Sequence, residues 1–268
     1  MGAPGLDTRR LAFGRVAELY DRARPSYPRQ AIDDVIEFAA IKAPARVLEV
    51  GAGTGKATAL LAERGFGVLA LEPSAAMAAV ARANCASYPA VEIVQSDFER
   101  WQARERFPAI VSAQAWHWVA PRTRYARAHE ALVPGGALAA LWTLPRWDAI
   151  GLRESLRAAY RDAAPALAPG FPMHPASEPA ELAGDWQAEI DASEGFAEAQ
   201  VRLHEWSCEY SAADYARLLQ THQDHILLER ERRDALLAAI TAVIEGSGGA
   251  IEMTYVTRVC LARRGGGG

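Results

Sequence analysis

A strand-like segment followed by a glycine-rich turn constrains this chain more than any other feature. Residues 46–50 are a short apolar run, and glycines stand at the alternate positions Gly51, Gly53 and Gly55. An alanine-rich helical pattern begins near Thr54. This order predicts a buried strand, a tight turn and a helix N-terminus. Glycines in the turn permit positive φ angles and close approach of a ligand, and free N–H groups at the helix start favour an anionic ligand group.

Two common phosphate-binding patterns do not fit this turn. A Walker A loop needs Gly-x-x-x-x-Gly-Lys-Ser/Thr, but Val50 and Ala57 occupy its first and last positions. A dinucleotide fingerprint needs Gly-x-Gly-x-x-Gly, but Lys56 stands where the third glycine belongs. The pattern that remains is Glu-x-Gly-x-Gly-x-Gly, starting at Glu49.

Two further acidic residues follow apolar runs at regular intervals. Glu72 closes the run 68–71, and the alternating segment 91–95 leads to Asp97. An acidic residue at the end of the second strand, about 20 residues after the turn, can hydrogen-bond ribose hydroxyls. Each acidic residue alone would fit a solvated strand end. Their order, at the spacing of successive βαβ units, favours a nucleotide-like ligand.

These motifs resemble those of class I S-adenosylmethionine-dependent methyltransferases, in the small-molecule group that includes trans-aconitate methyltransferase-like proteins. The pattern from Glu49 resembles motif I of that family. Residues 20–28 resemble its Tyr-x-x-x-Arg-Pro-x-Tyr-Pro signature, and residues 113–119 and 132–136 resemble two more of its recurrent stretches. The resemblance spans roughly residues 9–143 and, weakly, the last strand.

The resemblance implies an α/β fold with a Rossmann-like class I methyltransferase sheet. The sheet is expected to be mostly parallel with an antiparallel last strand, helices on both faces and a helical cap. The expected segments are an N-terminal helical lid at 1–45, a cofactor-binding core at 46–143, an acceptor-side cap at 144–250 with one core strand near 200–210, a final core strand at 251–264 and a flexible tail at 265–268.

The resemblance also implies that S-adenosyl-L-methionine is the cofactor. Arg24 would then face the methionine carboxylate, Asp97 the adenine amino group, and Phe98 the adenine ring. Met77 can pack in the core or touch adenine. The full set of expected cofactor-binding residues is Tyr20, Arg24, Glu49, Gly51, Gly53, Thr54, Gly55, Glu72, Pro73, Met77, Asp97, Phe98 and Gln114.

Trp116, His117 and Trp118 are the acceptor-side candidates, because they follow the fourth expected strand at the edge where open α/β sheets bind ligands. His117 would act as a base or an orienting hydrogen-bond partner, and the two indoles would wall the pocket. The alternative is aromatic packing around a histidine that bonds a backbone carbonyl. We also place His222 on the acceptor side. His222 and His225 lie one helical turn apart, but few nearby ligands complete a metal site, so we expect no metal.

Composition limits the remaining function classes. The formal charge of −4 gives no general basic field for nucleic acid. The sequence has no apolar stretch of membrane-spanning length, and its start lacks the apolar core of a signal peptide. The expectation is therefore a cytoplasmic monomer or homodimer that acts on a small-molecule acceptor, with no nucleic-acid or membrane partner.

The expected chemistry is in-line displacement at the methyl carbon of a sulfonium, with oxygen, nitrogen and carbon all open as the accepting atom. A protein that binds the cofactor without transferring the methyl group is the main alternative. A nicotinamide-dependent oxidoreductase is a second alternative. Lys56 and the absence of a Tyr-x-x-x-Lys pair argue against the oxidoreductase.

Overall fold

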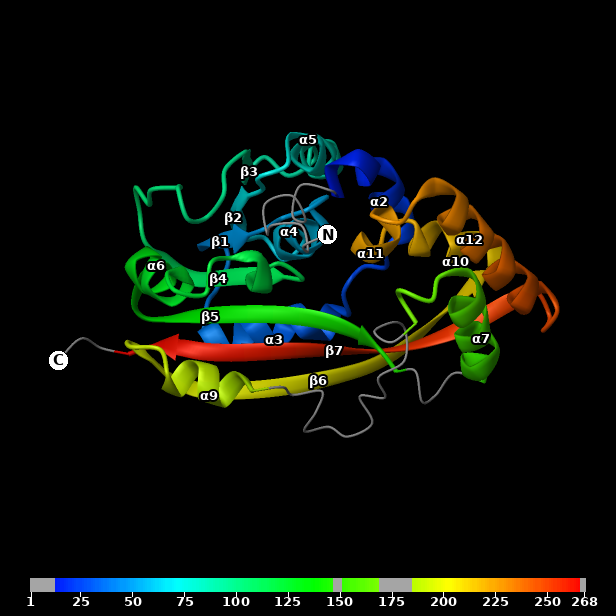
Figure 1. Ribbon diagram of the computed structural model, residues 1–268. Coiled ribbons are helices and arrows are strands. Elements are labelled where there is room, and N and C mark those ends of the chain that lie inside the picture. Colours follow the sequence, from blue (N-terminus) through cyan, green and yellow to red (C-terminus); the bar gives the residue numbers. More distant parts are fainter. Residues whose placement is uncertain (1–12, 147–150, 169–184, 266–268) are drawn as a thin grey trace.

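The structure is a computed structural model that describes residues 13–146, 151–168 and 185–265. Within these ranges one seven-stranded sheet has the order β3-β2-β1-β4-β5-β7-β6 (Figure 1). The strands are β1 (Arg46–Val50), β2 (Gly67–Leu71), β3 (Val91–Val94), β4 (Phe107–Ala113), β5 (Leu132–Pro145), β6 (Phe196–Ser211) and β7 (Ala250–Arg264). Strands β1 to β5 pair in parallel, and β7 is antiparallel to both of its neighbours. The expected Rossmann-like sheet is confirmed.

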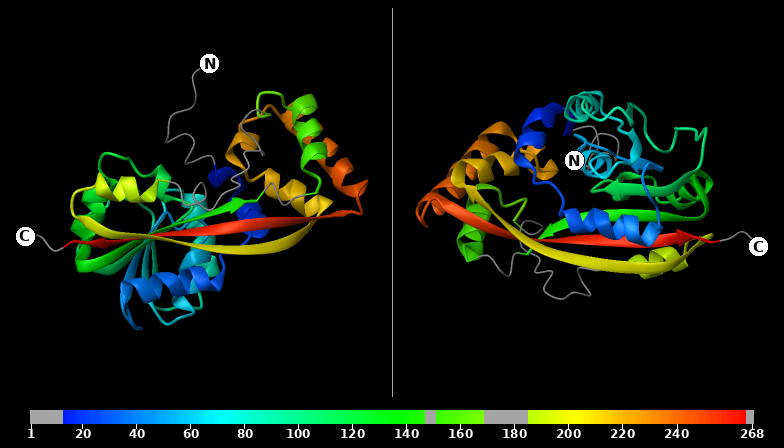
Figure 2. Two further views of the ribbon diagram at one scale, coloured as in Figure 1. Left: turned by 90° about the horizontal axis from the view of Figure 1, so that it is seen from below. Right: turned by 180° about the vertical axis from the view of Figure 1, so that it is seen from behind.

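Alternate residues of the inner strands face two different apolar layers. On β1, Val47 packs with one layer, whereas Leu48 and Val50 pack with the other. Helices α3 (Arg29–Ala39) and α4 (Lys56–Ala62) contribute to the first layer, and α6 (Arg124–Ala131) and α9 (Trp186–Asp191) to the second. Figure 2 shows the blue α3 and the yellow-green α9 on opposite faces of the sheet. Burial on both faces explains why these strands are almost continuously apolar.

Strands β6 and β7 form a ribbon that continues beyond the rest of the sheet. They pair as far as Ser211 and Ala250, whereas the pairing of β5 with β7 ends at Pro145 and Tyr255. The projecting end packs against α7 (Arg153–Ala163), α10 (Ala212–Leu219) and α12 (Arg230–Glu245) in an apolar cluster of its own. We call this cluster and its elements, with α11 (Gln223–Ile226), the cap. The sequence pattern predicted a shorter sixth strand, near residues 200–210.

Capping residues set several helix starts. The Ser211 hydroxyl accepts the backbone N–H of Asp214 at 3.1 Å at the start of α10, as its position in the sequence predicts. The Ser74 hydroxyl accepts the N–H of Met77 at the start of α5 (Ala75–Asn84). Helix α4 begins at Lys56, two residues after the predicted start.

The N-terminal segment comprises the short helix η1 (Phe13–Val16) and α2 (Ala17–Ala23). The sequence predicted a helix from Thr8 to Tyr20, and its part before residue 13 lies outside the described residues. Helix α2 ends just before Arg24, where Pro25 and Pro28 force extended backbone. Figure 1 shows α2 between α5 and the cap.

Strand order places a crevice at the carboxyl end of β1. The chain passes from β1 to β2 on one side and later reaches β4 on the other side, so the connections leave this edge in opposite directions. Open α/β sheets bind ligands at such a switch point. Among the helices in the described ranges, none is both long and apolar enough to cross a bilayer.

Candidate functional site

Three glycines with left-handed backbone form the turn between β1 and α4. Their φ angles are 77° at Gly51, 58° at Gly53 and 85° at Gly55. A Cβ at Gly51 would lie 2.3 Å from the Cβ of Ala115, and one at Gly55 would lie 3.3 Å from Ala81. A Cβ at Gly53 would meet no atom within 4 Å. Gly51 and Gly55 therefore permit close packing, whereas Gly53 faces open space.

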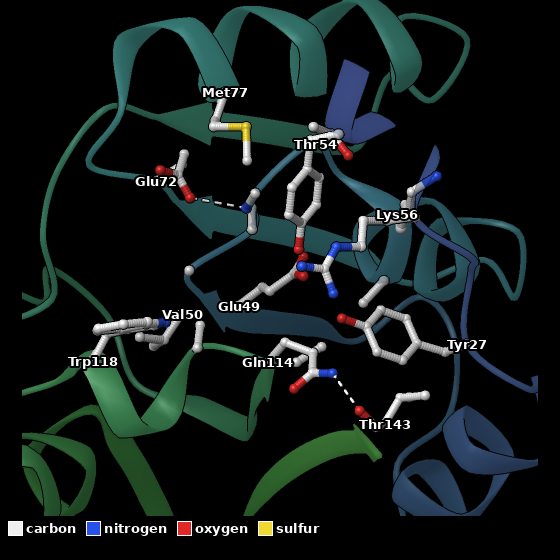
Figure 3. Close-up of a pocket in the computed structure, with 18 of the residues that line it drawn as sticks. Tyr27, Glu49, Val50, Thr54, Lys56, Glu72, Met77, Gln114, Trp118 and Thr143 are labelled. Atoms are coloured by element: carbon white, nitrogen blue, oxygen red, sulfur yellow. Dashed lines mark hydrogen bonds between the residues drawn. The ribbon is translucent and has the colours of Figure 1, made fainter. Parts of the chain in front are cut away.

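A cavity of about 190 Å³ lies at this edge of the sheet and reaches the cap. The glycine turn and the ends of β2 and β4 line one part (Figure 3). Residues of α10 and β7 line another part. Fourteen of the expected site residues line it: Tyr20, Arg24, Glu49, Gly51, Gly53, Thr54, Glu72, Pro73, Met77, Asp97, Phe98, Gln114, Trp118 and His222. Gly55, Trp116 and His117 are not part of its lining.

Glu72 fixes the open side of the turn. Its carboxylate accepts the backbone N–H of Gly53 through Oε2 and that of Ser74 through Oε1, both at 2.8 Å (Figure 3). The residue is 7% exposed. Its carboxylate therefore lies at the wall of the cavity and fixes the turn.

The loop after β3 supplies the next part of the lining. The Asp97 carboxylate accepts the backbone N–H of Arg100 at 2.9 Å and is held at the cavity wall. Phe98 is buried and stacks on Trp101 with ring centroids 6.5 Å apart. Met77 projects from α5 beside Glu72 (Figure 3). An acidic group with an apolar ring and a thioether suits a planar, polar-edged ligand.

Helix α2 and the residue after it are attached to both sides of the cavity. Arg24 donates from Nε to the Thr221 hydroxyl at 2.8 Å and from Nη2 to the Thr221 carbonyl at 3.2 Å, on the cap side. On the core side, Lys56 Nζ donates to the Asp21 carbonyl at 2.7 Å, and Asn84 donates to the Asp21 carboxylate at 3.0 Å. These bonds hold Tyr20 and Arg24 over the cavity.

Gln114 bends the chain at the end of β4. Its φ is 57°, in the left-handed region that side-chain-bearing residues seldom adopt. Its N–H donates to the Leu141 carbonyl at 2.8 Å, and Nε2 donates to the Thr143 carbonyl at 2.9 Å (Figure 3). Such backbone strain is typical of ligand sites, and here it turns the amide toward the cavity.

Glu49 lies beneath the turn and is 1% exposed. Its carboxyl accepts a short hydrogen bond from the Thr58 hydroxyl. The pKa of Glu49 is raised to about 8, chiefly by burial; the Thr58 bond lowers it and the nearby charge of Glu72 adds to the rise. The carboxyl is therefore largely protonated at neutral pH in the ligand-free protein.

The comparison with known protein families agrees with this geometry. Residues 47–136, which include the glycine turn, Glu72 and Asp97, match a family described as "Methyltransferase domain". This segment, about a third of the chain, is similar to a methyltransferase domain, and we call it the methyltransferase domain below. The resemblance drawn from the sequence motifs is thus confirmed for the part of the chain that forms the core of the cavity.

Two curated relatives each match a little under half of the chain. An uncharacterized methyltransferase of Mycobacterium tuberculosis is 41% identical over 132 residues, which cover 49% of this chain and 52% of the relative. A trans-aconitate 2-methyltransferase of an Acidovorax species is 32% identical over 124 residues, which cover 45% of this chain and 46% of the relative. The chain thus spans about half the length of these curated relatives.

Solved structures share the fold over a larger part of the chain. A phosphoethanolamine N-methyltransferase 2 of Haemonchus contortus, solved in complex with S-adenosyl-L-methionine, aligns with a TM-score of 0.53 at 15% identity. The alignment covers 99% of this chain and 61% of that one. At this identity the likeness shows the fold, which is that of Rossmann-like methyltransferases.

The structure separates the Trp116, His117 and Trp118 side chains, which the sequence analysis had grouped in one pocket wall. The three residues form the short 3₁₀ helix η2 (Trp116–Trp118). With three residues per turn, successive side chains point about 120° apart, so a single one of them can face the cavity of the methyltransferase domain. Trp118 lines the cavity. Trp116 is 1% exposed and packs against Phe98 and Tyr125 in the core, which corrects its expected place.

His117 lies at the exposed surface of the domain. Its Nδ1 accepts the indole N–H of Trp142 at 3.1 Å, so the neutral ring carries its proton on Nε2. Desolvation lowers the pKa of His117, and the charge of Arg124 lowers it further. Neither nitrogen then has a lone pair to offer as a base, and the side chain is outside the cavity lining. This geometry does not provide the acceptor-side role that the sequence predicted for His117.

His222 lies at the cavity wall, and His225 lies behind it. The ring centroids are 5.6 Å apart, and His225 Nε2 bonds the buried Tyr160 hydroxyl at 2.8 Å. Burial lowers the pKa of His222 well below its usual value, and Arg24 and His225 lower it further. Burial and then Arg24 lower the pKa of His225 to about 4. Both rings are neutral at physiological pH.

Several lining residues were not expected from the sequence. Lys56 entered the sequence analysis because it breaks two other motifs, and its contact with Asp21 across 35 residues has no local signal. Tyr27 belongs to the signature segment that also contains Arg24, so that resemblance could have indicated it. The cap-side lining was missed as a group: Thr143, Pro145, Tyr215, Leu218, Met253 and Tyr255.

Glu49→Gln is expected to flatten the pH dependence of stability in the ligand-free protein. The carboxyl titrates near 8 when folded and at its ordinary value of 4.5 when unfolded. Between these values the folded state holds more protons, so the wild type loses stability as pH rises through about 8. From pH 5 to 9 the loss is on the order of 4 kcal/mol relative to the variant. Thermal melts of both proteins from pH 5 to 9 measure it, and parallel curves would contradict the raised pKa.

Proposed function

We propose that this protein binds S-adenosyl-L-methionine in the cavity and transfers its methyl group to a small molecule held beneath the cap. The observation that carries the proposal is the continuity of one cavity from the glycine turn to the cap-side wall. A cofactor on the methyltransferase-domain side would thereby share a space with a second molecule. The relative named trans-aconitate 2-methyltransferase supports a small acceptor.

Two features of the ligand-free site fit a cofactor with a nucleoside part and an amino-acid part. The direction in which a Gly53 side chain would project is open, so a ligand can approach the backbone there. The Thr54 hydroxyl oxygen is buried and has no hydrogen-bond partner among the described residues. Buried polar atoms are usually paired, so this one is consistent with a partner supplied by a ligand.

Each end of the cofactor has a chemically suitable set of residues. The Glu72 carboxylate at the cavity wall suits ribose hydroxyls, and Asp97 with Phe98 and Met77 suits adenine. Arg24, fixed by Thr221, is the cation available to a carboxylate. Glu49 suits an ammonium group, because a nearby positive charge would lower the pKa of its carboxyl and favour the ionised form.

The cofactor supplies a methyl group on a sulfonium, which leaves as a neutral thioether. The residues of the site therefore contribute mainly by aligning the accepting atom and by excluding water. Helix α2 covers the cavity through its bonds to Lys56 and Asn84. Gln114 and Trp118 lie where β4 ends, between the cofactor side and the cap side, and would shape the contact between the two molecules.

Transfer of a labelled methyl group tests the function. The protein is incubated with methyl-tritiated S-adenosyl-L-methionine and a panel of small alcohols, phenols, acids and amines, and the products are separated by chromatography. The proposal expects labelled small molecules and the release of S-adenosyl-L-homocysteine. If the protein binds the cofactor with micromolar affinity but labels no panel member, the result contradicts the proposed transfer and favours a protein that binds the cofactor without transferring the methyl group.

A further inference from the structure

The charged residues of the cavity lining and the uncharged residues at its cap end come from different parts of the chain. Every charged residue of the described lining comes from the first hundred residues: Arg24, Glu49, Lys56, Glu72, Asp97 and Glu99. From residue 113 onward the described lining contains no Asp, Glu, Lys or Arg. Among the later residues, Tyr215, Leu218, His222, Met253 and Tyr255 form the part of the cavity nearest the cap. The side chains that the cap contributes are therefore uncharged, and the charge that reaches this end is that of Arg24, which bonds Thr221.

The polar groups at the cap end are neutral at physiological pH. Burial raises the pKa of Tyr215 well above its usual value and the pKa of Tyr255 to about 12. His222 is an uncharged imidazole for the reasons given above. Leu218 and Met253, 3% and 2% exposed, provide apolar surface beside these groups. The cap end thus offers aromatic and thioether surface together with hydroxyl and imidazole hydrogen-bonding groups.

A charged acceptor would be disfavoured in this environment. Moving an ion from water to a site without a counter-charge costs several kcal/mol. A cation would also be repelled by Arg24, whose charge already lowers the pKa values of His222, His225 and Tyr255. An anion would compete for Arg24 with the carboxylate of the cofactor.

We propose that the acceptor is an uncharged hydroxyl compound with a planar apolar body, of the phenol class, whose hydroxyl hydrogen-bonds to His222. The inference rests on the proposed function. In the reaction the hydroxyl oxygen forms a bond to the methyl carbon as the carbon–sulfur bond breaks. The bonding electron pair stays on sulfur, which becomes a neutral thioether, and the hydroxyl proton is released to solvent.

Binding of a matched probe series tests the acceptor class. The probes are 4-ethylphenol, 4-ethylbenzoate and 4-ethylbenzylammonium, titrated by calorimetry into the protein saturated with S-adenosyl-L-homocysteine. The phenol is expected to bind at least about tenfold more tightly than either ion, the scale of one uncompensated charge at a partly solvated site. Tighter or equal binding of an ion, or binding of no probe, would overturn the inference.

Variants of His222 test the hydrogen bond. His222→Phe should weaken phenol binding about tenfold, and His222→Gln, which keeps an acceptor, should restore part of the loss. His204→Phe is the matched control, because His204 lies on β6 outside the lining, and it should leave phenol binding unchanged. Equal affinities of all four proteins for the phenol would show that His222 does not bind the acceptor hydroxyl.

Failure of the acceptor class can be distinguished from failure of the proposed function. If the wild type does not bind S-adenosyl-L-homocysteine, the proposed function itself fails. If it binds S-adenosyl-L-homocysteine but binds an ion as tightly as the phenol, the acceptor class alone is overturned.

Discussion

Gly53→Val is expected to weaken binding of S-adenosyl-L-methionine by at least about 100-fold, which corresponds to about 3 kcal/mol. The glycine has a φ of 58°, and a Cβ there would contact no protein atom within 4 Å. The branched side chain therefore enters the cavity where the ligand would approach the turn. The backbone conformation adds roughly 1–2 kcal/mol of strain to the folded state. Calorimetric titration of the purified variant measures the loss of affinity.

Gly135→Val provides the matched control. Gly135 has a φ of 74° and also has no atom within 4 Å of a built Cβ, but it lies within β5, outside the cavity lining. Both variants should lose similar thermal stability because their backbone strain is similar. Only Gly53→Val should lose the cofactor. If valine prevents folding, the pair Gly53→Ala and Gly135→Ala carries the same comparison with less strain. Equal cofactor affinities within a pair would disprove the assignment of the turn.

Glu72→Ala is expected to weaken cofactor binding by about 1.5–3 kcal/mol, the scale of a hydrogen bond to a charged group. That range corresponds to roughly 10- to 150-fold in the dissociation constant. The substitution removes the acceptors proposed for the ribose. It also leaves the N–H groups of Gly53 and Ser74 without their present partner, so the turn itself should be less well fixed.

Glu92→Ala separates this effect from a general loss of negative charge. Glu92 lies on the neighbouring strand β3, is exposed, and pairs with Arg46 at the surface. Surface substitutions of this kind usually change stability by less than about 0.5 kcal/mol, and cofactor affinity should stay at the wild-type value. Glu72→Gln should fall between the two, because the amide keeps one acceptor oxygen. An unchanged affinity in Glu72→Ala would rule out the proposed contact.

The core of the methyltransferase domain was predictable because its signals are local. Gly51, Gly53 and Glu72 lie close to the ends of β1 and β2, and parallel strands bring those ends to one edge of the sheet. The strand alternation and the interrupting turns are sufficient to predict that arrangement. The family resemblance implied that Gln114 is a site residue, but its left-handed backbone has no sequence signal, since glutamine rarely adopts that conformation.

The cap side was much harder to predict from the sequence. Tyr215 reaches the cavity because the β6–β7 ribbon projects beyond β5 and carries α10, and Tyr255 lies where that projection begins, opposite Pro145. No short motif encodes the length of a ribbon. Trp116 and His117 show a different difficulty. The sequence correctly predicted that both residues follow β4. The direction of each side chain, however, depends on whether the segment is extended or a 3₁₀ turn. That conformation is set by packing of Trp116 against Phe98 and Tyr125.

The central claim is that the cavity at the glycine turn is an S-adenosyl-L-methionine site, and calorimetric titration of the wild-type protein tests it most directly. The protein is titrated separately with S-adenosyl-L-methionine, S-adenosyl-L-homocysteine and NAD. The account predicts saturable binding of the first two at one site and no binding of NAD, because Lys56 replaces the third glycine of a dinucleotide turn. Binding of NAD in preference to both methionine derivatives, or no binding of either derivative, would contradict it.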